Sequence, residues 1–196
     1  MKKYLQWGFI SFISFLAMGC CLIPEKVQLD PTTYDKGVEN IGHGRVVALQ
    51  VVDGRTRKDI GNRPSGFGPM ASISLDNDPV KAVYTAVSTG LTARGFVPVD
   101  YQSHRNEPAS LTLTLHELQY EQKTAIMIFS ISIYSSIDAS VKHNSEHYQR
   151  VYHAGQSKNY PVIPMTVIDE DNINEVLSDN INKIFFDKKL MSALAK

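Results

Sequence analysis

Cysteine is scarce in this sequence and is confined to its start. The 196 residues contain two cysteines, and these are the neighbours Cys20 and Cys21. Adjacent Cα atoms lie about 3.8 Å apart, whereas a disulfide usually joins Cα atoms roughly 5.5 Å apart, so the two are a poor disulfide pair. Because no third cysteine follows, we expect neither a disulfide nor a cysteine-ligated zinc site in the folded domain.

Net charge and long apolar runs are lacking as well. Twenty Lys and Arg side chains balance twenty Asp and Glu, so no strong field favours nucleic acid and we expect no nucleic-acid partner. The apolar run over residues 4–18 is short for a membrane-spanning helix, which needs about 20 residues. A chain with 43% hydrophobic residues can bury one ordinary core, and we expect one folded domain.

The N-terminus has the layout of a secretory signal peptide. Two lysines are followed by the apolar run and then by small residues, in the order that signal peptides share. The segment Ala17-Met18-Gly19-Cys20 resembles the lipobox of bacterial lipoproteins. That resemblance implies removal of residues 1–19 and attachment of lipid to the thiol of Cys20. The alternative is an ordinary signal peptide, or an uncleaved anchor, that contains a cysteine.

The residue after the lipobox bears on the membrane to which the protein is sorted. Cys21 stands where enteric-type lipoproteins carry Asp as an inner-membrane retention signal, so the resemblance implies the outer membrane, with the domain facing the periplasm. Residues 20–44 contain Pro24 and Pro31 and no sustained period, which predicts a tether with a short edge strand at residues 26–29. Fully extended, such a tether would reach about 80 Å.

Residues 45–196 carry the periodic patterns of a folded domain. A β-branched run at residues 45–52 predicts a buried strand, and the glycine-rich residues 54–74 predict a long loop. Asp78-Pro79 and Gly95 are typical of the start and the end of a helix. Further strands are predicted at residues 96–99, 111–116, 127–142 and 148–156, a second helix from residues 171–172, and a last short piece at residues 190–194.

These elements predict an α+β fold. Alternation of apolar and polar residues in the middle of the chain favours a mainly antiparallel sheet with one wet face, and two helices should pack on the other face. The expected order is β-α-β-β-β-β-α.

Three segments of the sequence resemble the YajG-type lipoproteins of Gram-negative bacteria: VALQVVDGRTRKDIG, GLTARGFVPV and NINEVLSDNINKIFFDKKLMSAL. The resemblance implies an envelope lipoprotein without an established enzymatic activity. The order of elements is also similar to that of small domains in periplasmic assembly lipoproteins, which dock other proteins. That second likeness concerns the scaffold and says little about function.

Two groups of residues are candidates for contact with a ligand or a partner. The first is a cluster of cations after the first strand, which could hold an anion unless Asp53 or Asp59 neutralises it. The second is an aromatic and basic stretch, which could be a contact surface or an ordinary strand between solvent and a helix. The candidates are Arg55, Arg57, Lys58 and Arg63 in the first group and Tyr148, Arg150 and Tyr152 in the second.

Metal and catalytic chemistry find little support in the sequence. His143 and His147 flank Glu146, but a turn or strand end does not align two side chains four residues apart, and no third ligand follows. No nucleophile elbow or ordered acid and base is present. We therefore expect no metal, no cofactor and no enzymatic activity.

The leading hypothesis is a non-enzymatic, lipid-anchored envelope protein that acts as a binding or assembly module. Its partner would be another envelope protein, as in an accessory subunit of an envelope-spanning secretion or motility complex. The alternative is a binder of an anionic small ligand or a peptidoglycan fragment through the loop from Arg55 to Arg63.

Overall fold

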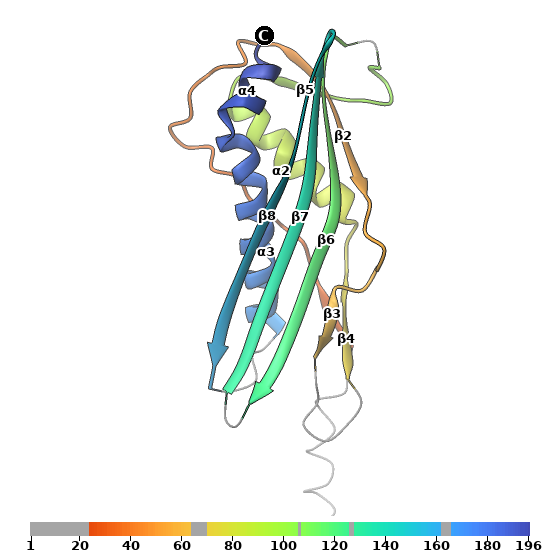
Figure 1. The fold of residues 1–196 in the computed structure, drawn as a ribbon, viewed down its shortest axis with the longest axis vertical. Helices are drawn as coiled ribbons and strands as arrows, with labels where there is room; N and C mark the ends of the chain where they lie inside the picture. The colour runs from red at the N-terminus through yellow and green to blue at the C-terminus, as the bar shows by residue number, and fades with distance from the viewer. Residues whose placement is uncertain (1–23, 64–69, 106, 126–127, 162–165) are drawn as a thin grey trace, which may run out of the picture.

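Three long antiparallel strands dominate the fold (Figure 1). β6 (Ala109–Ala125) pairs with β7 (Ile128–His143), and β7 pairs with β8 (Glu146–Tyr160). Their apolar residues alternate inward as the sequence predicts, with a bulge in β6 between Leu115 and Glu117. The computed structural model describes residues 24–63, 70–105, 107–125, 128–161 and 166–196.

The other strands make the sheet a mixed one. β2 (Val46–Asp53) lies parallel to β6 on one side and to β5 (Val97–Asp100) on the other. β3 (Gly61–Arg63) is parallel to β6 and antiparallel to β4 (Ala71–Leu75), which is parallel to β1 (Glu25–Val27). The expectation of a mainly antiparallel sheet is thus correct for β6 to β8 and for the β3–β4 pair, whereas the other pairings are parallel. Two parallel strands that lie side by side need a crossover connection between them. Between β2 and β5, the chain forms the antiparallel pair β3–β4 and then a helix.

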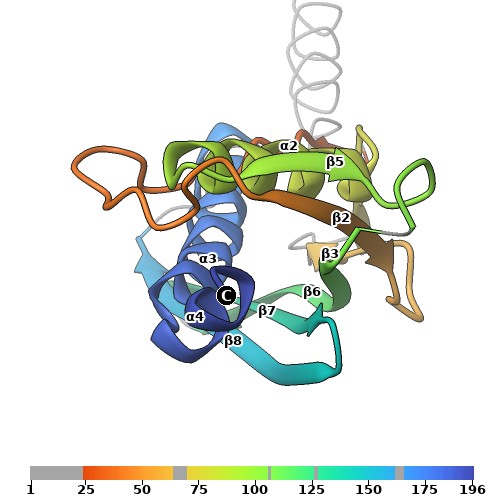
Figure 2. The same cartoon turned by 90° about the horizontal axis from the view of Figure 1, so that it is seen from above.

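Three helices share one core with the sheet, and the α+β class is confirmed. α2 (Pro79–Ala93) packs on β2 and β5, while α3 (Thr166–Phe186) and α4 (Lys188–Leu194) pack on β7 and β8. Figure 2 shows the sheet curled, with α3 and α4 beside its β7–β8 part. The Asp78 side chain accepts a hydrogen bond from the N–H of Val80, and Gly95 adopts a φ of +80°, so both predicted ends of α2 are confirmed.

The predicted loop over residues 54–74 is wrong in part, because it contains β3 and β4. Its glycines signalled a loop, but Gly61 has another role. A Cβ atom at Gly61 would lie 2.0 Å from the carbonyl oxygen of Tyr120, so glycine is what allows β3 to approach β6. α3 also begins at Thr166, before the predicted start, and the last short piece is α4. The observed order is therefore longer than β-α-β-β-β-β-α.

Most of the predicted tether is folded onto the domain. β1 confirms a short edge strand near the expected place, and the chain after it runs along α3. Four alternate backbone N–H groups of this N-terminal segment (residues 28–34) donate to side chains spaced four residues apart on α3. The pairs are Gln28 with Glu170 at 2.9 Å, Asp30 with Asn174 at 2.7 Å, Thr32 with Ser178 at 2.9 Å and Tyr34 with Asn182 at 2.8 Å.

This ladder follows from a match of two repeat lengths. Two residues of extended chain advance by about 6.6 Å, and four residues of α-helix advance by about 6 Å. The side-chain amides of Asn174 and Asn182 also donate to the carbonyls of Gln28 and Thr32. α3 thus provides hydrogen-bond partners for the backbone of residues 28–34, as a neighbouring strand would. The interpretation of residues 20–44 as a tether is therefore wrong from β1 onward.

A buried ionic cluster fixes the start of the same segment. Arg63 of β3 forms ion pairs with Asp169 of α3 and, at 2.7 Å, with Glu25 of β1. The hydroxyl of Tyr120 lies 3.2 Å from the carboxylate of Asp169, whose side chain is fully buried. Burial raises the pKa of Asp169, against the opposing effect of Arg63. Breaking such a pair leaves a buried charge without compensation, so β1, β3 and α3 are held in one arrangement.

The ladder gives a first testable prediction. Asn182→Ala leaves the N–H of Tyr34 without its acceptor at a site where Asn182 is 4% exposed. We expect the free energy of unfolding to fall by about 1–3 kcal/mol. The measurement is urea unfolding of the chain from residue 22 onward. Asp179→Ala on the same helix, with a side chain 56% exposed, is the control and should change stability by less than about 0.5 kcal/mol. Equal effects of the two substitutions would show that the ladder does not hold the segment.

Candidate functional site

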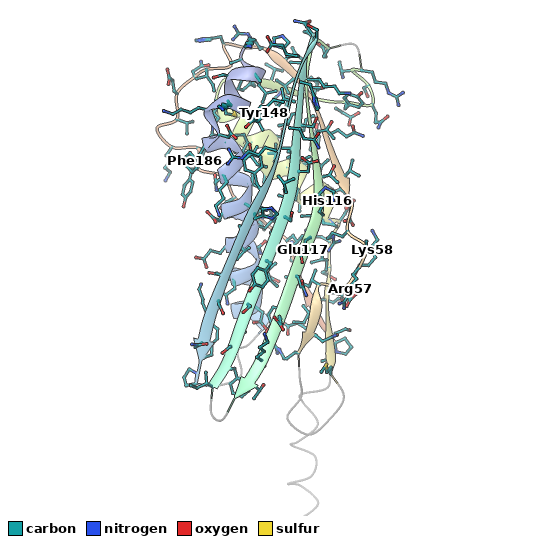
Figure 3. The ribbon with its side chains drawn as sticks, viewed as in Figure 1. Arg57, Lys58, His116, Glu117, Tyr148 and Phe186 are labelled. Atoms are coloured by element: carbon teal, nitrogen blue, oxygen red, sulfur yellow. The ribbon has the colours of Figure 1, made fainter. Side chains whose placement is uncertain are left out.

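The predicted cation loop follows β2 and lies beside the bulge of β6. Figure 3 shows Arg57 and Lys58 on this loop, on the same side of the molecule as His116 and Glu117 of β6. A cavity of about 280 Å³ separates the two elements. Its lining residues are Arg55, Thr56, Arg57, Asp59, Ile60, His116, Glu117, Leu118, Gln119 and Ser136.

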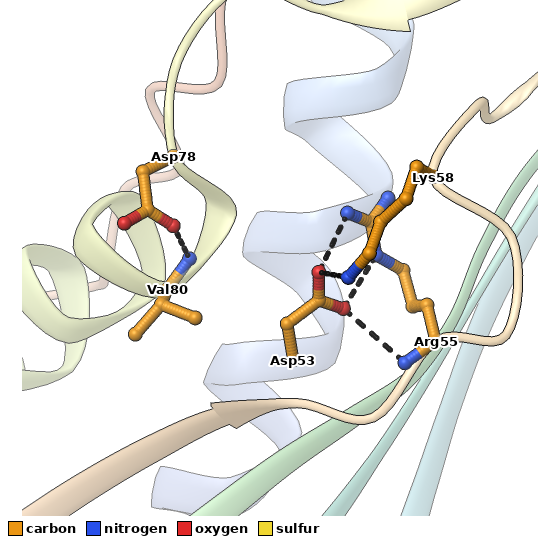
Figure 4. A network of polar contacts seen from close by, with 5 residues as sticks. All are labelled: Asp53, Arg55, Lys58, Asp78 and Val80. Atoms are coloured by element: carbon orange, nitrogen blue, oxygen red, sulfur yellow. Dashed lines mark hydrogen bonds and ion pairs between the residues drawn. The ribbon is translucent and has the colours of Figure 1, made fainter.

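Asp53, the last residue of β2, neutralises two of the predicted cations (Figure 4). Its carboxylate accepts hydrogen bonds from Nε of Arg55 at 2.8 Å and from Nζ of Lys58 at 3.0 Å. The backbone N–H of Arg55 donates to the same carboxylate, and the Arg55 side chain is 4% exposed. Hydrogen bonds from Arg55, then Lys58, hold the pKa of Asp53 well below its usual range. These contacts of Asp53 with Arg55 and Lys58 are local and stabilise the turn after β2.

The other two predicted cations have carboxylate partners elsewhere. Arg57 pairs with Asp59 on the same exposed loop. Arg63 lies on β3 and pairs with Glu25 and Asp169 in the buried cluster. The structure therefore does not gather the four cations around one vacant position. Each of the four cations already contacts a carboxylate, which weakens the case for the anionic-ligand hypothesis.

His116 and Glu117 were missed by the sequence reasoning, although a signal was present. The inward residues of β6 alternate up to Leu115 and then resume at Leu118, a spacing of three in place of two. Such a break is typical of a β-bulge, which redirects the side chains at that point. Here it presents His116 and Glu117 to the cavity beside the cation loop.

The second predicted group meets at one carboxylate. Oδ2 of Asp187 accepts hydrogen bonds from the hydroxyl of Tyr152 at 2.7 Å, from Nη1 of Arg150 at 2.9 Å and from the hydroxyl of Tyr148 at 3.0 Å. Oδ1 accepts from the N–H groups of Lys189 and Leu190, at the start of α4. The structure brings the three predicted residues together, and their contacts with Asp187 join β8 to α4. Of the two interpretations, a contact surface or an ordinary strand between solvent and a helix, the second fits.

The charge of Asp187 is stabilised by these contacts. Burial by itself would raise the pKa of Asp187, but hydrogen bonds from Tyr152, the Leu190 N–H, Tyr148 and Arg150 outweigh it and lower the pKa to about 2. Burial and the Asp187 carboxylate in turn raise the pKa of Tyr152. The carboxylate also sits at a helix N-terminus, where negative charge is favourable.

A second cavity, of about 410 Å³, lies between α4 and the turn from β7 to β8. The sequence reasoning did not predict it. It is lined by Val141, His143, Glu146, His147, Tyr148, Lys188, Lys189, Ser192, Ala193 and Lys196. His143 and His147 stand on neighbouring strands, and Nε2 of His147 is 2.9 Å from the hydroxyl of Ser140. Within the described ranges, no three His, Cys, Asp or Glu side chains gather as a metal site.

The predicted lipidation site, Cys20, lies outside the described residues, as does the predicted signal peptide over residues 1–19. In the part of the chain that the structure describes, no helix has the length and apolar character needed to cross a membrane.

Asp187 provides a second testable prediction. A carboxyl group with a lowered folded-state pKa stabilises the fold fully above its unfolded pKa of about 3.9, and this contribution is lost as the pH falls toward 2. At pH 7 we expect Asp187→Asn to cost about 2 kcal/mol of unfolding free energy. The difference in unfolding free energy between Asp187→Asn and the wild type should narrow between pH 5 and pH 2. Urea unfolding followed by circular dichroism measures it. A gap that stays constant with pH would contradict the stabilised charge.

One solved structure supports the fold, and two others are less similar to it. A Xanthomonas campestris protein assigned to family DUF330 has a TM-score of 0.54 and 10% identity, with 85% of this chain and 96% of that chain covered. A minor lipoprotein of Acinetobacter baumannii is 11% identical over 76% of this chain and 93% of that one, with a TM-score of 0.45. A lipoprotein of Neisseria meningitidis is 10% identical over 72% and 98%, with a TM-score of 0.38.

No curated protein matches the sequence. The sequence does match a protein family over residues 32–195, and that family is described as uncharacterized lipoprotein. The matched range takes in the elements from β2 to α4 and the last three residues of the segment that lies on α3. The chain belongs to this family of lipoproteins.

Proposed function

We propose that this chain is a non-enzymatic lipoprotein of the bacterial envelope, held in the outer membrane by a lipid on Cys20 and facing the periplasm. Its family membership over residues 32–195 supports the lipoprotein assignment. The lipobox-like residues 17–20 precede the matched range and support Cys20 as the lipidated residue. The resemblance to YajG-type proteins supports that narrower type, and Cys21 in place of Asp supports the outer membrane.

The lipid attachment gives a third testable prediction. Cys20→Ala removes the thiol that would carry the lipid, so we expect loss of palmitate labelling in cells and release of the protein from the membrane fraction. Cys21→Ala is the matched control and should retain both the label and the membrane location. Labelling of the Cys20→Ala variant would overturn the assignment.

We further propose that the domain acts as a binding or assembly module. The observation that carries this is β8, a strand of 15 residues that, in the described part of the sheet, pairs with β7 alone. The unpaired side of such an edge offers backbone donors and acceptors to a strand of another chain. Most side chains of β8 are exposed, including Val151 at 45%.

The partner would be another envelope protein, as in an accessory subunit of an envelope-spanning secretion or motility complex. The side chains that the sequence indicated as candidate contact residues are paired with carboxylates. The four cations contact Asp53, Asp59 and the carboxylates of the buried cluster. Tyr148, Arg150 and Tyr152 contact Asp187. These groups stabilise the fold, which favours a binding role over catalysis.

Val151 and Val52 form a matched pair for a fourth prediction. Pairing of Val52 with Thr114, of Thr114 with Asp138 and of Asp138 with Val151 places both valines in one row across the sheet. Val151 lies on the edge strand, and Val52, 38% exposed, lies on β2. We expect a photo-crosslinking amino acid at position 151, in intact cells, to capture an envelope protein that position 52 does not capture.

The two valines also distinguish an interaction at the edge strand β8 from one that involves the whole face of the sheet. Val151→Lys should weaken recovery of the captured protein because lysine blocks strand addition at an edge, whereas Val52→Lys should leave it unchanged. Absence of any reproducible adduct at position 151, or equal adducts at both positions, would remove support for docking at β8.

A further inference from the structure

The chain between the proposed lipid and the folded domain is short. β1 begins at Glu25 and pairs with β4, so five residue steps separate it from Cys20. At no more than about 3.6 Å per residue, these steps span at most about 18 Å. This is far less than the reach of a tether that extended to residue 44.

The strand registers show which end of the sheet faces the lipid. Glu25 is level with Ile73, Ile73 with Gly61, and Gly61 with Tyr120. β1 runs opposite to β6, so the chain before Glu25 leaves the domain in the direction in which β6 continues from Tyr120 to its end. Ala125 is five residues beyond Tyr120, which is about 17 Å of strand. The ends of β6 and β7 therefore extend about as far as Cys20 can reach.

Exposed apolar side chains lie at this end of the sheet. Ile128 begins β7 opposite Ala125 and is 47% exposed. Met70 stands directly before β4 and is 68% exposed. Figure 1 shows this end at the bottom of the view, opposite the C-terminus and β5. An exposed apolar side chain at the end of the protein that a lipid anchor holds close to a bilayer is placed for contact with that apolar phase.

We propose that Met70 and Ile128 lie in the membrane–water interface when Cys20 carries its lipid. This inference rests on the lipid anchor proposed above. A bilayer fits this place because the lipid on Cys20 must reach the acyl chains. Cys20 can lie only about as far from Glu25 as the ends of β6 and β7 extend, so those ends come close to the bilayer. Lys123 and Glu121, the exposed charges next to these residues, pair with each other at 3.2 Å. Apolar insertion, more than attraction to anionic headgroups, would then hold this end at the surface.

The mature protein allows a direct test with single tryptophans. The chain has one tryptophan, Trp7, within residues 1–19, so the processed protein would have none. Ile128→Trp and Met70→Trp place a reporter at the proposed interface. Val97→Trp on β5, where the native valine is 46% exposed, is the control at the opposite end. Each full-length variant is expressed with its lipid and reconstituted into vesicles of phosphatidylethanolamine and phosphatidylglycerol that contain brominated lipid.

We expect blue-shifted emission and several-fold stronger quenching by bromine at positions 128 and 70 than at position 97. Quenching at positions 128 and 70 no stronger than at position 97, in protein that floats with the vesicles, would overturn this inference and leave the anchor intact. Protein that does not float with the vesicles would overturn the anchor itself. Circular dichroism and thermal melting of each variant verify that the fold is unchanged.

Discussion

The hydrogen-bond ladder between residues 28–34 and α3 is the constraint on which the rest of the architecture depends. It works because an extended chain and a helix advance by nearly equal distances in two and four residues, respectively. The ladder ties the N-terminal part of the chain to the C-terminal helix, and the buried pairs of Arg63 extend the same attachment to β1 and β3. Because the segment is fixed there, the length of free chain before the domain is set by the fold.

Three carboxylates of this protein, those of Asp53, Asp169 and Asp187, stabilise the fold through their contacts with cations and hydroxyl groups. Asp53 closes the turn after β2, Asp187 joins β8 to α4, and Asp169 joins α3 to β3. Clusters of arginine and tyrosine resemble binding sites in a sequence because the same side chains suit both tasks. Only the position of the carboxylates in three dimensions distinguishes the two uses. The surfaces that we propose for contact are therefore the backbone edge of β8, for a protein partner, and the apolar end of the sheet, for the membrane.

Much of the fold could be predicted where a single element carries its own signal. The cap at Asp78, the stop at Gly95 and the alternation in β6 and β7 are local patterns, and the structure has them all. The sequence could not reveal β3 and β4, since three to five residues give no period, nor the parallel pairings, which depend on distant partners. The contacts of α3 were hidden for a different reason. Asn174, Ser178 and Asn182 appear as a solvated helix face until the N-terminal segment that they bind is known.

The ladder also has a consequence for the order of events during synthesis. Its bonds join residues 142 to 148 positions apart, so residues 28–34 lack their partners on α3 until nearly the whole chain has been made. Contacts of such long sequence separation form late, since the entropy of closing the loop must be met first. If Cys20 carries the lipid as proposed, residues 28–34 would find their place on α3 only after lipidation, at the membrane surface to which the lipid holds the chain.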